Sequence, residues 1–304
     1  MDLGGPLALG GAPVASAPMI DWLTEAFEPE LMQRALVAGL LASAATAVVG
    51  TWVVLRGLTF LGDALAHGVV PGLALAVLWG FSPFVGAFLA ALVMSGAVTV
   101  VSRRAQVRED TGIGLLFVGM LALGVVIVSR SDNFTGDLTS LLFGDVLGVT
   151  AGDLRGQAVG TAVVVAVSVV LYRPFLALAF NEDKAATLGL RPGLAHATLM
   201  VLLATAIVAS FQAIGTLLVF GLLIGPPATA SLLVRRVPLI MVTAVALGAG
   251  AVVAGLAVSY HHDTAGGATI AGLAVAEFFV VLAGQELVAL LGRGRRRRLA
   301  SGTA

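Results

Sequence analysis

A carboxylate and an imidazole stand four residues apart in a stretch of sequence that is otherwise apolar. In a helix this spacing places Asp63 and His67 one turn apart on the same face, where they can bind one divalent cation together or hydrogen-bond to each other. Imidazole with carboxylate suits a transition metal ion better than Mg2+ or Ca2+, which prefer oxygen ligands alone. The pattern therefore indicates a metal path, and the alternative is a pair that only holds two helices in register.

The residues around this pair favour a narrow polar passage between closely packed helices. Pro71 has no backbone N–H, so it leaves the carbonyl of His67 without its helical partner. That oxygen would need water, a side chain or an ion. Small residues let helix backbones approach each other closely, and Gly or Ala occupies positions 62, 64, 66, 68, 72, 74 and 76.

Three further potential metal ligands follow one another at the end of a later apolar run. His261, His262 and Asp263 could capture a metal ion, but neighbouring side chains converge only across a turn, and a solvated loop is the alternative. Glu277 is a lone carboxylate within a span, and we expect it to face other helices. His196 stands near the start of its helix, where we expect a satisfied interfacial histidine rather than a ligand.

The composition of the chain requires a membrane. The sequence has 304 residues and a mean hydropathy of +1.03, with 59% hydrophobic and only 11% charged residues, whereas about a quarter of the residues in a soluble domain are charged. A helix needs about 20 apolar residues to cross a bilayer, so this length allows roughly eight to ten crossings. The absence of cysteine excludes disulfides, thiolate metal sites and cysteine nucleophiles.

The apolar runs predict an all-α integral membrane protein, a polytopic bundle of roughly eight or nine transmembrane helices. The run at 194–234 is about twice as long as one crossing, and we expect it to turn near 210–212. The stretch 138–149 is too short to cross and contains Asp145, so it predicts a short re-entrant or interfacial helix. The other predicted spans are 35–55, 64–81, 84–101, 112–129, 157–172, 238–258 and 268–291.

The two ends of the chain carry opposite charge. Residues 1–30 form an acidic leader that we expect to be poorly ordered or interfacial, residues 31–291 form a single transmembrane domain, and residues 292–304 form an Arg-rich tail. Basic residues near helix ends mark the cytoplasmic side. With nine crossings the basic clusters fall on one side, which places the C-terminus in the cytoplasm and the leader outside. Eight crossings would move the leader inside.

Several separated motifs resemble those of one family of membrane proteins. They occur in the same order along residues 31–290, and they are similar to the permeases of ATP-binding-cassette importers for zinc, manganese and iron. The resemblance implies a homodimeric permease domain that works with two cassette ATPases and an extracytoplasmic metal-binding protein. The motifs are VLRGLTFLGDALAHGVVPG at 54–72, LLFGDVL at 141–147, GTLLV at 215–219, LLIGPPATA at 222–230, and Ser259 to Asp263 with Gly266.

The resemblance implies roles for individual residues. Asp63 and His67 fall on the acidic and histidine positions of the second helix, where the metal is expected to pass. The segment 181–189 resembles the cytoplasmic segment that docks on the ATPase. Its composition suits a short helix that starts at Asn181 and ends at a glycine, and a plain interfacial connector is the alternative. The residues implied in coupling to the ATPase are Glu182, Lys184, Ala185 and Gly189.

Some residues depart from the family pattern. Pro227 stands where the family usually has alanine, so Pro226 and Pro227 together should kink their helix and free two carbonyl groups. Glu277 lies outside the pattern, and the pair His261–His262 is individual to this chain.

The sequence therefore predicts a transport subunit rather than an enzyme. It contains no G-x-x-x-x-G-K-[ST] motif, so ATP hydrolysis is expected on a separate cassette subunit. We expect the chain to carry Zn2+ or Mn2+ into the cytoplasm, with zinc favoured and iron as a further candidate. No permanently bound cofactor is expected. The localisation expected is the plasma membrane, with membrane lipid rather than nucleic acid as the partner of the arginine tail.

Two other classes remain open from the sequence. The chain could be an ion- or proton-coupled secondary transporter, in which Asp63, His67 and Glu277 form a relay. It could also be a membrane scaffold that transports nothing, in which Asp63 and His67 only hold helices together.

Overall fold

The computed structural model of the chain describes residues 18–104, 109–129, 148–180 and 182–301. Within these ranges the chain is helical and contains no strand. The helices are α1 (Pro18–Ala26), α2 (Glu30–Leu55), α3 (Thr59–Gly68), α4 (Val70–Trp79), α5 (Pro83–Arg104), α6 (Glu109–Val128), α8 (Ala151–Val170), α9 (Tyr172–Phe180), α10 (Glu182–Thr187), α11 (Pro192–Ile214), α12 (Thr216–Leu233), α13 (Val237–His262) and α14 (Gly266–Ser301).

The helices are of the length and composition that membrane crossing requires. Among the described residues, 8 candidate spans are long and apolar enough to cross a bilayer, and α3 and α4 together make one of them. The other seven are α2, α5, α6, α8, α11, α13 and α14, and α12 contributes a shorter apolar helix, Leu218–Leu233. The predicted class, an all-α polytopic membrane protein, is therefore confirmed.

Two helix boundaries differ from the prediction. The run 194–234 does form two helices, but the break falls at Gly215 instead of 210–212, because Gly215 adopts a φ of 78° that other residues avoid. The predicted span 64–81 is interrupted at Val69, between α3 and α4. Pro71 lies in the first turn of α4, where its missing N–H has no helical partner to lose.

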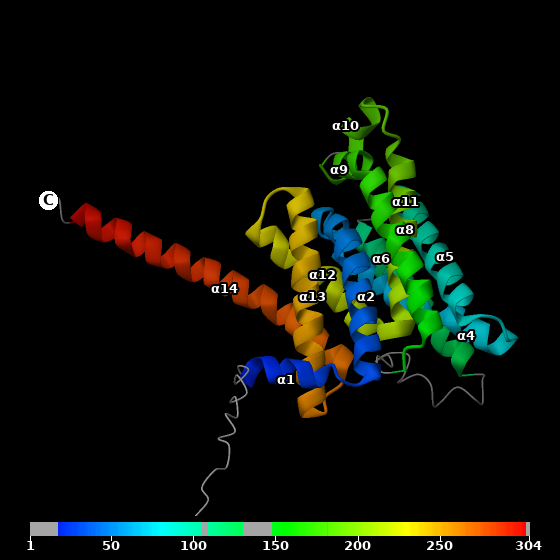
Figure 1. The fold of residues 1–304 in the computed structure, drawn as a ribbon. Helices are drawn as coiled ribbons and strands as arrows, with labels where there is room; N and C mark the ends of the chain where they lie inside the picture. The colour runs from blue at the N-terminus through cyan, green and yellow to red at the C-terminus, as the bar shows by residue number, and fades with distance from the viewer. Residues whose placement is uncertain (1–17, 105–108, 130–147, 181, 302–304) are drawn as a thin grey trace, which may run out of the picture.

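The predicted ends of the chain are partly helical. Within the acidic leader, α1 lies across the end of α13 (Figure 1), while residues 1–17 lie outside the described part. The predicted re-entrant stretch 138–149 also lies outside it, apart from Gly148 and Val149 directly before α8. At the other end, α14 continues through most of the Arg-rich tail to Ser301 and diverges from the bundle.

Helix α2 forms the centre of the bundle. It packs against α8, α11, α12 and α13, and its buried face consists mostly of small residues such as Ala35, Ala38, Ala42 and Ala45. Small side chains allow helices to approach closely in a bilayer, where packing and polar contacts hold them together. At Gly50 an added Cβ would lie 2.0 Å from the carbonyl oxygen of Leu223 in α12. This is one of the two carbonyls that Pro226 and Pro227 free from helical bonding.

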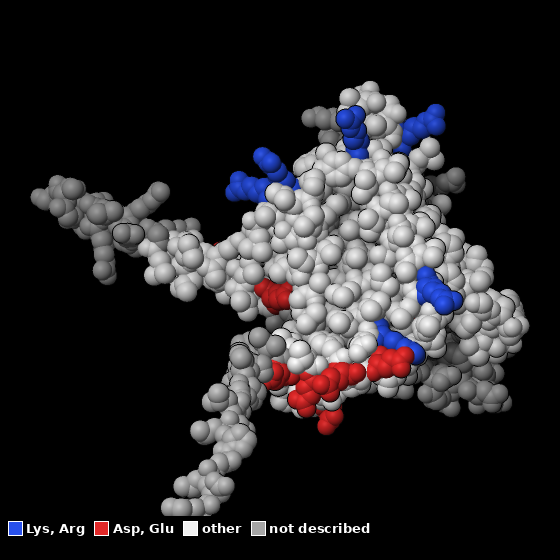
Figure 2. All heavy atoms as spheres, viewed as in Figure 1, with Lys and Arg blue, Asp and Glu red and all other residues white. Residues whose placement is uncertain are grey.

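Charged side chains separate toward the two ends of the bundle (Figure 2). Acidic residues of α1 and the start of α2, Asp21, Glu25, Glu28 and Glu30, are exposed at one end. Arg34 lies there too and pairs with Glu30. Most of the other basic side chains in this view stand at the opposite end, where α9 and α10 lie, while one basic patch lies on the flank nearer the acidic end. Arg173 belongs to α9 and Arg191 directly precedes α11.

The contact between α4 and α5 generates a test of this packing. A Cβ on Gly86 would lie 2.3 Å from the carbonyl oxygen of Gly72 and 2.8 Å from the Cβ of Ala76. We expect Gly86→Ala to lower the free energy of unfolding by about 1–3 kcal/mol, since overpacking separates the helices. Thermal unfolding in detergent micelles measures the change. Gly96→Ala is the matched control, because a Cβ on Gly96 in the same helix would have no neighbouring atom within 4 Å. Equal loss of stability in both variants would contradict the close contact of α4 with α5.

Candidate functional site

Asp63 and His67 lie one turn apart on α3, as their spacing predicts. His67 Nε2 is 3.5 Å from Asp63 Oδ1, and their side chains are 30% and 28% exposed, respectively. This distance is longer than the 2.7–2.9 Å of a good charge-assisted hydrogen bond. The two groups are therefore close enough to share a cation and too loosely paired to exclude one.

Close packing on the other sides of α3 fixes the direction in which this pair faces. A Cβ on Gly62 would lie 2.4 Å from Leu223 Cδ2 of α12, and one on Gly68 would lie 2.1 Å from the sulfur of Met94 in α5. These glycines bring α3 against both neighbours. Asp63 and His67 remain partly exposed on the face of α3 that follows Thr59 in steps of four residues.

An aromatic side chain of α6 covers part of this face. The ring of Phe117 meets the ring of His67 at 5.7 Å and 69°, and it meets Phe60 at 5.9 Å and 67°. Edge-to-face contacts of this kind restrict ring orientation and contribute about 0.5–1.5 kcal/mol. Sequence analysis missed Phe117, because one phenylalanine in an apolar helix gives no signal of its neighbours.

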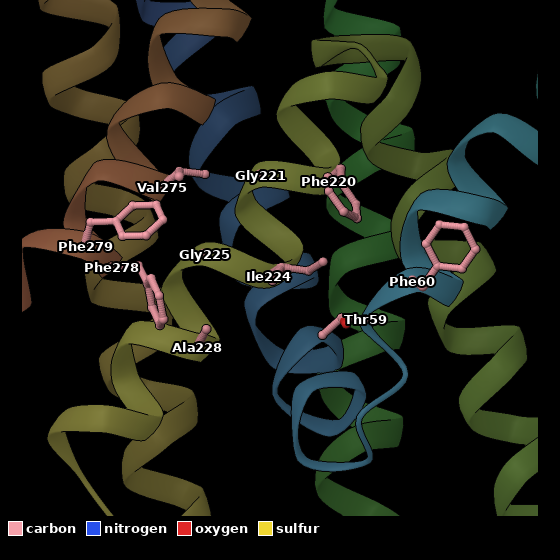
Figure 3. A pocket seen from close by; sticks show the side chains of 10 residues that line it. All are labelled: Thr59, Phe60, Phe220, Gly221, Ile224, Gly225, Ala228, Val275, Phe278 and Phe279. Atoms are coloured by element: carbon pink, nitrogen blue, oxygen red, sulfur yellow. The ribbon is translucent and has the colours of Figure 1, made fainter. Parts of the chain in front are cut away.

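The same face of α3 borders an apolar cavity of about 400 Å3 (Figure 3). Figure 3 shows Phe60 of α3 on one side, Phe220 and Ile224 of α12 in the middle, and Phe278 and Phe279 of α14 on the other. Thr59 also lines the cavity, one turn before Asp63. The start of α3 thus borders an apolar groove between α3, α12 and α14, and Asp63 follows one turn farther along the helix.

The outer-loop residues do not form a comparable cluster. His261 and His262 end α13, and Asp263 follows with a φ of 51°. His261 Nε2 lies 2.9 Å from the carbonyl oxygen of Trp22, and the two rings stack at 4.5 Å, so this histidine secures α1. No group of three His, Cys, Asp or Glu side chains is arranged to hold a metal ion in the described ranges. A metal role for His261, His262 and Asp263 stays a prediction.

The segment expected to contact the ATPase forms the short helix α10. The amides of Gly189 and Leu190 bond to the carbonyls of Ala186 and Ala185, and Gly189 has a φ of 72°. This Schellman cap confirms Gly189 as the helix stop. Ala185 is fully buried. Glu182 and Lys184 belong to α10, but their side chains lie outside the described part.

His196 and Glu277, two polar residues within the bundle, differ in their hydrogen bonding. His196 is 8% exposed and lies 2.9 Å from Arg56, so it is a satisfied histidine near the helix start, as predicted. Glu277 is half-buried, as expected for a side chain that faces other helices, and its Oε2 has no hydrogen-bond partner among the described atoms.

The sequence of this chain is similar to those of metal transport proteins. Residues 28–285 match the ABC 3 transport family. The chain is 36% identical over 265 residues to a probable iron transport system membrane protein of Haemophilus influenzae, with 87% of this chain and 97% of that protein covered. It is 35% identical over 276 residues to the manganese transport system membrane protein MntC of Halalkalibacterium halodurans, with 90% and 94% covered.

The fold is also similar to solved structures. The chain matches one described as PsaBC from Streptococcus pneumoniae in complex with Fab, with a TM-score of 0.77 and 28% identity, over 86% of this chain and 95% of that one. It matches an inward-facing metal-chelate type ABC transporter with a TM-score of 0.69 and 19% identity, over 90% and 91%. The second likeness concerns the fold alone.

The ring contact of Phe117 with His67 can be tested by metal binding. We expect Phe117→Leu to weaken the binding of Co2+ to the purified chain about 2- to 10-fold, because His67 loses the contact that restricts its ring. Phe117→Tyr keeps the ring and should bind like the native chain. Calorimetric titration in detergent measures the affinity.

Phe88→Leu is the control, since Phe88 of α5 stacks on Phe84. If it weakened Co2+ binding as much as Phe117→Leu does, the loss of any aromatic pair would account for the effect and the positioning of His67 would be contradicted.

Proposed function

Because the chain belongs to the ABC 3 transport family, we propose that it is the permease that passes a divalent transition metal ion into the cytoplasm, with ATP hydrolysed on a separate cassette subunit. Its relatives are membrane and permease proteins of transport systems, so the chain is a transport subunit and not an enzyme. No permanently bound cofactor is needed for this role, since the metal ion is the cargo.

The observation that carries the proposal is the loose pair of Asp63 and His67. A carboxylate and an imidazole that are mostly buried in an apolar helix are costly, which favours a role on a transport path. At 3.5 Å the pair can open to accept an ion and then release it. Phe117, whose ring contacts that of His67, borders the same path.

One chain supplies two donors, and a second copy would supply two more. Two Asp63–His67 pairs that face each other across an axis of symmetry would provide four donors, and water would complete the octahedral coordination that Mn2+ prefers. The apolar groove beside the pair supports this arrangement, because Phe60 and Phe279 are 41% and 60% exposed there. We therefore propose a homodimer with the path between its two copies.

The relatives support manganese or iron more than zinc. Five of the similar proteins carry manganese in their names and one carries iron. Carboxylate and imidazole groups can ligate all three ions, Mn2+, Fe2+ and Zn2+. In the general order of affinity, zinc binds more tightly than the other two. We propose Mn2+ or Fe2+ as the cargo, and competition by Zn2+ in the transport assay tests this choice.

The charge distribution supports the orientation of the permease. The basic end with α9 and α10 would face the cytoplasm, so that α10 meets the ATPase and the C-terminus lies inside the cell. The acidic end with α1 would face outward in the plasma membrane, toward an extracytoplasmic metal-binding protein. Membrane lipid would surround the remaining helices, and anionic lipid headgroups at the cytoplasmic surface would bind the Arg-rich tail.

One observation favours a second candidate function. Glu277, in the first half of α14, holds a buried carboxylate oxygen that has no hydrogen-bond partner within the described part of the chain, and such a group can carry protons in a secondary transporter. That transporter would continue without a cassette subunit and stop when the proton gradient collapses.

Metal uptake tests the proposed function directly. We expect vesicles with the chain, its ATPase, enclosed ATP and the binding protein outside to take up 54Mn2+. Asp63→Asn or His67→Leu should reduce the uptake at least about tenfold, because the first removes a negative charge and the second an imidazole donor, each worth at least about 1.4 kcal/mol. Glu286→Gln, an exposed carboxylate of α14, serves as the control and should transport normally.

Assembly with the ATPase is checked by size-exclusion chromatography for each variant. Uptake that needs no ATP would favour the secondary transporter, and uptake unchanged by both substitutions would exclude Asp63 and His67 from the path.

The cap of α10 gives a separate test of the ATPase contact. We expect Gly189→Ala to reduce the ATPase rate of the assembled transporter about two- to fivefold, because an L-residue at a φ of 72° costs about 1–2 kcal/mol and shifts α10. Gly80→Ala is the matched control: Gly80 has a φ of 69°, also with open space around it, but it ends α4. Equal loss in both variants would mean that strain alone is responsible.

A further inference from the structure

A hydrogen bond joins two residues that are 140 positions apart in the chain. Arg56 Nη1 lies 2.9 Å from His196 Nδ1, and His196 is only 8% exposed. Neither residue belongs to the metal pair or to α10. They lie between those two elements, since Arg56 stands shortly before the start of α3 and His196 is near the start of α11.

Arg56 stands at the start of the connection to the metal pair. It is the C-cap residue of α2, and Gly57 follows with a φ of 69°. The amides of Gly57 and Leu58 bond to the carbonyls of Val54 and Val53, which is a Schellman cap. Helix α3 then begins at Thr59 and carries Asp63 in its second turn. A displacement of Arg56 therefore moves the base of α3.

His196 stands at the end of the connection from α10. Helix α11 starts at Pro192, and His196 lies in its second turn. The Schellman cap at Gly189 and the left-handed Arg191, with a φ of 44°, join α10 to α11 in a tight turn. A displacement of α10 therefore moves the first turns of α11 with it.

The chemistry of the bond makes it a strong and specific link. Arginine stays protonated and can only donate, so His196 Nδ1 must accept, and the neutral imidazole carries its proton on Nε2. Hydrogen bonds with a charged donor are about twice as strong as neutral ones. Loss of this donor would remove a charge-assisted bond from a buried histidine. The link is thus costly to break and fixes the base of α3 relative to α11.

We propose that Arg56 and His196 are positioning residues that transmit the movement of α10 to the Asp63–His67 pair. The inference rests on the proposed function, since it presumes a cassette ATPase that moves α10. In this role the bond couples ATP hydrolysis to the opening of the metal path. Without it, the ATPase cycle continues while the metal pair no longer follows.

The number of ions transported per ATP hydrolysed is the measurement that tests the link. We expect His196→Leu and Arg56→Met to lower this ratio at least about fivefold in vesicles with the ATPase and binding protein, with the ATPase rate retained. His196→Asn keeps an acceptor near the position of Nδ1 and should restore at least half of the native ratio.

A buried contact elsewhere on α2 provides the matched control. Gln157 of α8 donates from Nε2 to the carbonyl oxygen of Ala38 at 2.9 Å and is 2% exposed. Gln157→Leu also breaks a buried bond between helices, but this bond does not lie between α10 and α3. We expect it to lower the stability and leave the transport ratio unchanged.

Combining the two substitutions completes the test. If Arg56 and His196 act through one bond, Arg56→Met with His196→Leu should lower the ratio no further than either change alone. A native ratio in His196→Leu, or a ratio lowered equally in Gln157→Leu, would overturn the inference. Absence of ATP-dependent uptake in the native chain would instead overturn the proposed function.

Discussion

The close approach of α3 to α5 and α12 is the constraint on which the site depends. A Cβ added at Gly62 would meet the end of the Leu223 side chain, and one added at Gly68 would meet the sulfur of Met94, so either change would force a neighbour to shift. Between these two contacts stand Asp63 and His67, held on the remaining open face of the helix. If α3 were a side chain's width farther out, the pair would lose its position beside Phe117 and the apolar groove. Small residues allow helices to pack closely in lipid. In this protein they also determine which face of α3 carries Asp63 and His67 toward the open side.

The remaining polar groups show how the bundle avoids the cost of burial. Thr46, Thr51 and Ser95 bond to carbonyls four residues earlier in their own helices. Gln157 and Thr161 bond across to α2. Asp63 and His67 stand apart from this pattern, because their mutual contact is long and both side chains keep access to solvent. A pair with tight internal bonds would compete with an ion, whereas this loose pair leaves its oxygen and nitrogen available.

Glycine caps organise the end of the bundle that carries α10. Gly57 and Gly189 both end their helices in a left-handed conformation, and both caps use the same pair of backbone bonds. The caps fix the directions in which α3 and α11 leave. The bond between Arg56 and His196 then ties these two directions together. Local turn chemistry and one long-range contact thus combine into a continuous connection from α10 to the metal pair.

The sequence by itself determined the membrane class, nearly all of the spans, the shared helical face of Asp63 and His67, and the stop at Gly189. Each of these follows from hydropathy, a 3.6-residue period or the freedom of glycine, which act over a few neighbouring residues. Only the tertiary structure decided that Phe117 meets His67, that Arg56 meets His196 and that His261 contacts Trp22 of α1. It also placed the helix break at Gly215, where the turn must fit between α11 and α12. Such contacts join residues far apart in the chain, and helix packing, not local pattern, selects them.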